Sequence, residues 1–218
     1  MLCGQQLVET RVEDVGRATR ADGREPYRGR VRGPLTYDDI ESFEAATNTP
    51  ERHRAAAATL VGWSGEVHPD DGVDVGPAQL LTAAAWHLGE AGDVEDSLAL
   101  YRRAVADGGT CLIDARVQLA GALMDAGQED EARQVCAGFR RSSPALADLA
   151  LMAEVFEAAG DLREAHRLVN IGVTRLELDV VPDPSPAEAF GIEQLVITRQ
   201  RIRQALGSPP DDLDVTSG

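Results

Sequence analysis

The stretch Glu90–Gly109, "EAGDVEDSLALYRRAVADGG", decides the fold, because its plan recurs twice further along the chain. "DAGQEDEARQVCAGFRRSSP" begins at Asp125, and "AAGDLREAHRLVNIGVTRLE" begins at Ala158. Each stretch has a small residue, a glycine and one or two polar residues, followed by an apolar stripe with helical spacing. A glycine in this place ends one helix in a left-handed cap. Each stretch therefore predicts a turn followed by the second helix of a hairpin.

The spacing of the turns indicates a repeat. The glycines Gly92, Gly127 and Gly160 are 35 and 33 residues apart, and a period of 20–50 residues is typical of stacked helical units. Units that begin at Ala78, Ile113 and Leu146 also share other positions. The eighth residue is alanine, the twentieth is small and the twenty-fourth is apolar or aromatic: Ala85, Ala120 and Ala153; Ser97, Ala132 and Ala165; Tyr101, Cys136 and Val169.

These positions are similar to those of the tetratricopeptide repeat (TPR) family, in a degenerate form, over residues 78–178. The resemblance implies an all-α fold, a TPR-like right-handed solenoid of antiparallel helix hairpins. The small residues have a physical reason independent of the family, because two antiparallel helices approach closely only where side chains are small. The alternative is a non-repeat helical bundle in which the spacing is a coincidence.

The rest of the chain is divided around these units. Thr36, and then Thr49 with Pro50, are helix-start signals that predict an N-terminal helix hairpin. A further amphipathic helix after a Pro-rich break suits a C-terminal cap on the last unit. The predicted segments are a flexible Arg/Gly-containing arm at 1–34, the hairpin at 35–65, an acidic Gly/Pro loop at 66–77, repeats at 78–112, 113–145 and 146–178, a Pro-rich linker at 179–186, the capping helix at 187–207 and a mobile tail at 208–218.

Charge and composition narrow the classes of partner. The net charge is −16, and residues 35–177 hold eleven Arg against twenty-five acids. Such a body repels the phosphate backbone, so nucleic acid is not expected as its partner. The sequence has no long apolar run for a membrane span and no apolar segment of a secretory signal at its N-terminus. We therefore expect a cytoplasmic protein with no membrane association.

A search for chemistry gives no catalytic site. The four histidines are widely separated, and Cys3, Cys111 and Cys136 lack metal-type spacing. No nucleophile elbow, zinc-protease helix or phosphate-binding loop is present. We expect no enzymatic activity, no catalytic residue, no metal and no cofactor.

The resemblance places a partner-binding groove on the first helix of each unit. At the family's groove positions the lining is acidic and partly apolar and contains no Arg, which disfavours the clamp that some family members form around a terminal carboxylate. A basic or amphipathic segment of a partner protein is expected instead, with Trp86 as its apolar anchor or as a packed core residue. The predicted groove residues are Gln79, Thr82, Trp86, Glu90, Asp114, Val117, Met124, Asp125, Glu154 and Glu157.

The leading interpretation is thus a non-catalytic protein–protein interaction scaffold or adaptor. One alternative is a self-associating structural protein, a homodimer in which the first hairpin or the C-terminal helix packs against a second copy. The other is an all-helical enzyme with an unrecognised site among the acids of the groove or of the loop at 66–76.

Overall fold

The computed structural model describes residues 33–215 except 67, 69, 73, 74, 179–182 and 210. Every regular element in these residues is a helix, so the predicted all-α class is confirmed for the described part of the chain. The helices are α1 (Tyr37–Ala46), α2 (Pro50–Ser64), α3 (Pro77–Glu90), α4 (Val94–Asp107), α5 (Ala115–Asp125), α6 (Glu129–Arg140), α7 (Leu146–Ala158), α8 (Leu162–Leu178), α9 (Pro186–Ala205) and α10 (Asp212–Val215). Of these helices, none is both long and apolar enough to cross a membrane.

The three turn glycines have the same backbone conformation. Gly92, Gly127 and Gly160 have φ angles of 82°, 72° and 82°, in the left-handed region where a side chain would be strained. The amide that follows each glycine donates to a carbonyl five residues earlier, as in the bond of 2.9 Å from Asp93 to Leu88. This is a Schellman cap, which satisfies carbonyls at the helix end. The predicted left-handed caps are confirmed.

The small residues lie where two helices of a pair are closest. The Ser97 hydroxyl on α4 donates to the carbonyl of Ala85 on α3 at 2.7 Å, and both residues are buried. In the next two units the corresponding alanines are completely buried: Ala120 and Ala132, and Ala153 and Ala165. A larger side chain at any of these positions would push the two helix axes apart.

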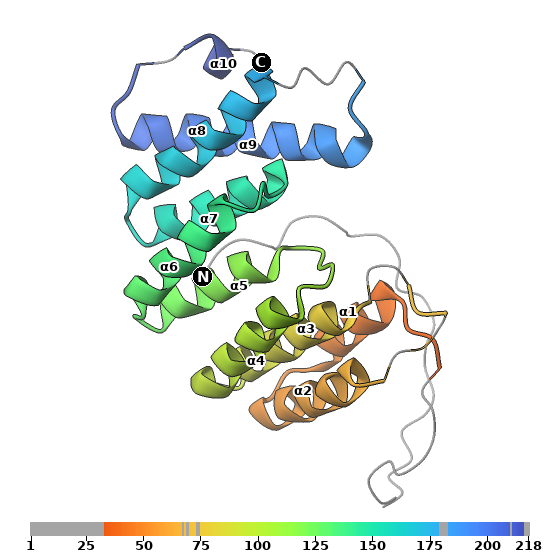
Figure 1. Ribbon diagram of the computed structural model, residues 1–218. Helices are drawn as coiled ribbons and strands as arrows, with labels where there is room; N and C mark the ends of the chain where they lie inside the picture. Colours follow the sequence, from red (N-terminus) through yellow and green to blue (C-terminus); the bar gives the residue numbers. More distant parts are fainter. Residues whose placement is uncertain are drawn as a thin grey trace, which may run out of the picture. The chain divides into compact units, whose positions relative to one another are not determined.

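Helices that follow one another pack in pairs, as Figure 1 shows for α3 with α4, α5 with α6, and α7 with α8. The first helix of one pair also contacts the first helix of the next, since α5 touches both α3 and α7. Buried side chains form two clusters, one with residues from α1 to α6 and one with residues from α5 to α9, and the partly buried Met124 and Val135 contact both. The packing is therefore continuous from α2 to α9.

The C-terminal helix α9 packs on α7 and α8. Two glycines allow this close approach. A Cβ at Gly172 on α8 would lie 2.5 Å from the Leu195 side chain, and a Cβ at Gly191 on α9 would lie 3.1 Å from the Ala147 backbone nitrogen. Ser185 and Glu188 start α9 with a reciprocal capping box.

The N-terminal helices begin at the predicted signals. The Thr49 side chain accepts from the Arg52 amide, and Pro50 is the first residue of α2. α2 packs along α3, and Leu35 and Ile40 from the α1 segment join the same buried cluster.

The predicted terminal segments are described in part. The flexible arm expected at residues 1–34 lies outside the described residues except for Gly33 and Pro34. In the C-terminal segment, expected to be mobile, residues 212–215 are helical and Asp211 accepts a hydrogen bond from Arg199 at 3.0 Å. This ion pair joins the segment to α9.

Candidate functional site

Trp86, the expected apolar anchor, lies against two histidines and is still 37 % exposed. Its ring contacts those of His53 on α2 and His87 on α3 edge-on, with centroids 5.7 and 4.9 Å away. α2 therefore supports one side of the indole, and the rest of the indole remains open to a partner. The Trp86 side chain is therefore both packed against the histidines and accessible.

His53 and His87 form a buried pair at this place. Their Nδ1 atoms are 2.9 Å apart, which requires one to donate and the other to accept. Nε2 of His87 is buried and has no hydrogen-bond partner among the described residues. Burial, and then the neighbouring His53, lower the pKa of His87 to about 4. His87 is therefore neutral at ordinary pH, and the contact between the two rings joins α2 to α3.

Sequence reasoning missed this pair, although a signal was present. The two histidines are 34 residues apart, which is one period of the repeat. α2 packs on α3, so wide separation in sequence did not mean separation in space.

Glu90 and Asp125 lie at the same place in two successive units. Glu90 is the last residue of α3 and Asp125 the last residue of α5. Both side chains are exposed, and neither has a charged partner among the described residues. The carbonyls at a helix C-terminus carry partial negative charge, so an acid there is unfavourable. Met124, beside Asp125, is partly buried between the two clusters.

Three of the predicted groove residues are buried and structural. Oε1 of Gln79 accepts from the Leu112 amide at 2.8 Å, and the Thr82 hydroxyl donates to the Gln79 carbonyl at 2.9 Å. Val117 is 4 % exposed and belongs to the second buried cluster. These side chains serve packing and loop anchoring and are not accessible to a partner.

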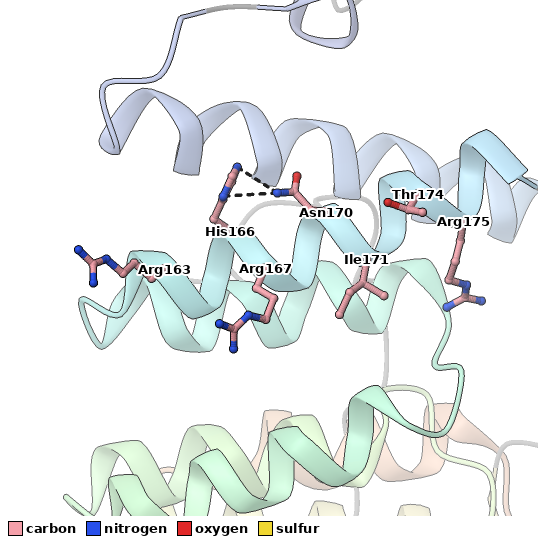
Figure 2. Close-up of a pocket in the computed structure, with 7 residues that line it drawn as sticks. All are labelled: Arg163, His166, Arg167, Asn170, Ile171, Thr174 and Arg175. Atoms are coloured by element: carbon pink, nitrogen blue, oxygen red, sulfur yellow. Dashed lines mark hydrogen bonds between the residues drawn. The ribbon is translucent and has the colours of Figure 1, made fainter.

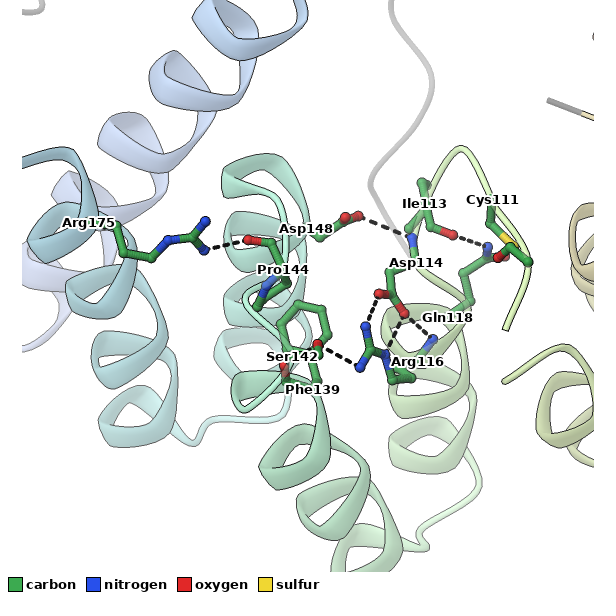
Figure 3. A network of polar contacts seen from close by, with 11 residues as sticks. Cys111, Ile113, Asp114, Arg116, Gln118, Phe139, Ser142, Pro144, Asp148 and Arg175 are labelled. Carbon is green, nitrogen blue, oxygen red and sulfur yellow. Dashed lines mark hydrogen bonds and ion pairs between the residues drawn. The ribbon is translucent and has the colours of Figure 1, made fainter. Parts of the chain in front are cut away.

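Asp114 is occupied by contacts within the chain, as Figure 3 shows. Its carboxylate caps α5 by accepting from the Arg116 amide at 2.9 Å, and it also pairs with the Arg116 guanidinium. Burial alone would raise the pKa of Asp114, but the hydrogen bonds from Arg116 outweigh it and lower the pKa. The Asp114 amide in turn donates to Asp148 at 3.1 Å. Asp114 therefore fixes the loop before α5.

In the third unit, Glu154 and Glu157 already hold a cation. Both lie on α7, and the Arg201 guanidinium of α9 donates to them at 3.0 and 2.7 Å. Oε1 of Glu154 also accepts from the Thr198 hydroxyl at 3.2 Å. Of the ten predicted groove residues, these two are brought together, but by the chain's own C-terminal helix.

The two described thiols are held protonated by their surroundings. Burial raises the pKa of Cys111 to about 11 and that of Cys136 to about 12, and nearby carboxylates add to both shifts. A thiol with such a pKa is a poor nucleophile. Within the described ranges, no three His, Cys, Asp or Glu side chains gather as metal ligands would.

The accessible part of the predicted surface is thus Trp86 with Glu90 and Asp125, on the first two units.

Comparison of the chain with protein-family models, with curated proteins and with solved structures finds no match.

Proposed function

We propose that this chain is a non-catalytic interaction scaffold built from TPR-like hairpins in a right-handed solenoid. Its first two units bind a basic or amphipathic segment of a partner protein. The observation that carries the proposal is Trp86, 37 % exposed one helical turn before the exposed acid Glu90. A half-open tryptophan beside an acid offers both an apolar contact and a charge to an arginine-bearing helix.

The placement of the two acids supports a binding role. An acid at a helix C-terminus costs about 0.3–1 kcal/mol of stability, and the chain has one at the end of α3 and one at the end of α5. Neither acid has an ion pair with another described residue that would offset this destabilisation. Residues that lower stability without a structural partner are typical of functional surfaces.

Contacts in the third unit support the proposal that the partner's segment is positively charged. There the acids of α7 hold Arg201, a cation presented by a helix that packs against them. A basic helix of another protein would use Glu90 and Asp125 in the same way. In the first two units no described basic side chain pairs with these acids.

The repeat architecture is supported by the common features of the three helix pairs. These are the left-handed glycine turns, the small residues between paired helices and the contacts from first helix to first helix. The raised pKa values of the two thiols support a non-catalytic role. The cytoplasmic location expected from the sequence remains part of the proposal.

A second candidate, self-association, is favoured by one observation. Phe190 and Ile197 lie seven residues apart on α9 and are 55 % and 41 % exposed, so they share one face of the helix. Light scattering over a range of concentrations tests this candidate. Self-association is supported if the mass of the unsubstituted protein rises with concentration and the double variant Phe190→Ser with Ile197→Ser stays monomeric. An unsubstituted protein that is monomeric at every concentration would exclude it.

The proposed function is tested by fluorescence anisotropy with a labelled amphipathic peptide that carries arginines one turn apart. Charge reversal by Glu90→Arg with Asp125→Arg should weaken binding at least about tenfold, or 1.4 kcal/mol. The matched control is Glu41→Arg with Glu193→Arg, which changes the net charge equally through exposed acids on α1 and α9. Equal losses in both variants, or no binding by the unsubstituted protein, would contradict the proposal.

A further inference from the structure

The open face of α8 has the opposite charge to most of the chain. Arg163, Arg167 and Arg175 follow one another at intervals of four and eight residues. The interval of four places Arg163 and Arg167 on one side of the helix, and all three arginines line the same hollow. The net charge of the whole chain is −16, so this basic stripe is a local reversal of sign.

The stripe is not neutralised by its neighbours. Arg167 donates to Glu164 at 2.8 Å, but Glu164 also accepts from Arg140 at 2.6 Å, so one carboxylate serves two cations. Arg175 donates to the Pro144 carbonyl, which carries no formal charge. Arg163 is exposed and has no ion pair with any described residue. Positive charge therefore remains along the whole stripe.

A hollow of about 580 Å³ lies along α8 (Figure 2). It is lined by the three arginines and by His166, Asn170 and Ile171, and no carboxylate is part of the lining. Figure 2 shows His166 and Asn170 on the side of α8 toward α9, while Arg167, Ile171 and Arg175 point to the other side. Ile171 is half-buried and gives the middle of the hollow an apolar contact.

The neighbouring helix adds to the positive field. Burial, then the charges of Arg203 and Arg199 on α9, lower the pKa of His166. The chain's own tail shows what such a surface attracts. Asp211 pairs with Arg203 at 3.3 Å and with Arg199, and Leu213, two residues later, contacts the buried cluster. An acid followed by an apolar residue thus already docks beside the hollow.

We propose that the α8 stripe is a second docking surface, which binds an acidic amphipathic segment of a partner protein. Acids of that segment pair with Arg163 and Arg167, and an apolar side chain of it covers Ile171. The α8 stripe shares no residue with the surface around Trp86, so the two surfaces can be tested separately. A chain with both would join a basic and an acidic partner.

The test is fluorescence anisotropy with a labelled helical peptide of about three turns, with glutamates one turn apart and a leucine one turn further along. A matched peptide has glutamine in place of each glutamate. The unsubstituted protein should bind the acidic peptide at least about tenfold more tightly than the glutamine peptide. It should bind a single-stranded oligonucleotide more weakly than the acidic peptide, and the oligonucleotide serves as a third probe.

Two variants test the site itself. Arg163→Glu with Arg167→Glu should weaken binding of the acidic peptide about tenfold or more, and the milder Arg163→Gln with Arg167→Gln should weaken it less. The control is Arg103→Glu with Arg141→Glu, exposed arginines on α4 and directly after α6; it should leave the affinity within about twofold. Circular dichroism verifies that each variant is folded.

Several outcomes would overturn the proposal. One is an equal loss of affinity for the acidic peptide in the control variant. Others are equal affinity for the glutamine and acidic peptides, tighter binding of the oligonucleotide than of the acidic peptide, and no binding of the acidic peptide by the unsubstituted protein. Folded Gln variants that retain full affinity would also overturn it.

Discussion

The Nδ1 atoms of His53 and His87 lie 2.9 Å apart in the contact between α2 and α3. The contact supports one side of Trp86. Protonation of His87 would add charge to a ring that is completely buried, and this is costly.

The pair predicts that stability falls in mild acid. The folded pKa of His87, about 4, is below its ordinary value of 6.5, so between these values the unfolded chain binds more protons than the folded one. The contribution of His87 is complete above pH 6.5 and is lost as the pH falls toward 4, by about 3 kcal/mol.

Urea denaturation at a series of pH values measures this effect. In His87→Phe the slope of unfolding free energy against pH should become smaller in this window. His166, whose pKa is also lowered, remains in both proteins and contributes equally to both. The same slope in both would contradict the assignment to His87.

Gly172 should be intolerant of any side chain. A methyl group there would lie 2.5 Å from the side chain of Leu195, which is completely buried. Gly172→Ala should therefore lower the free energy of unfolding by about 1–3 kcal/mol. The control Gly138→Ala, on α6 with open space around it, should raise it by up to about 1 kcal/mol because alanine favours helix. Similar values for both would show that α9 does not pack closely on α8.

Arg201 should hold α9 to α7. Its guanidinium meets two partly buried carboxylates, Glu154 and Glu157, so Arg201→Ala should cost about 1 kcal/mol, and less at high salt. Arg103→Ala, at an exposed position on α4, should change the stability by less than about 0.5 kcal/mol. Thermal melts at two salt concentrations distinguish an ion pair from mere packing of the arginine stem, which would show no salt dependence.

The acids at the ends of α3 and α5 should lower the free energy of unfolding. Replacing Glu90 and Asp125 by arginine puts positive charge beside the terminal carbonyls and should stabilise the fold by about 0.5–2 kcal/mol in total. A decrease in the unfolding free energy would contradict this view of the two positions and would indicate an undetected structural partner.

The repeating features of the fold were predictable from sequence. Which of the predicted groove residues are covered by other parts of the chain was not. Glycine at a turn and alanine between helices have local causes, and Gly92 and Ala85 could be placed from spacing alone. The groove residues depend on which helix covers them. Nothing in the sequence around Glu154 indicates that Arg201, 47 residues later, binds it, and Asp114 was assigned to the groove although it caps its own helix.

The central claim is that a basic segment binds beside Trp86, and the fluorescence of this residue tests it most directly. The chain has two tryptophans, so Trp63→Phe leaves Trp86 as the only one. We predict that the arginine-bearing amphipathic peptide shifts the Trp86 emission to shorter wavelength in a saturable way. The shift should disappear in Glu90→Arg with Asp125→Arg and remain in Glu41→Arg with Glu193→Arg. An unchanged Trp86 emission at saturating peptide would contradict the account.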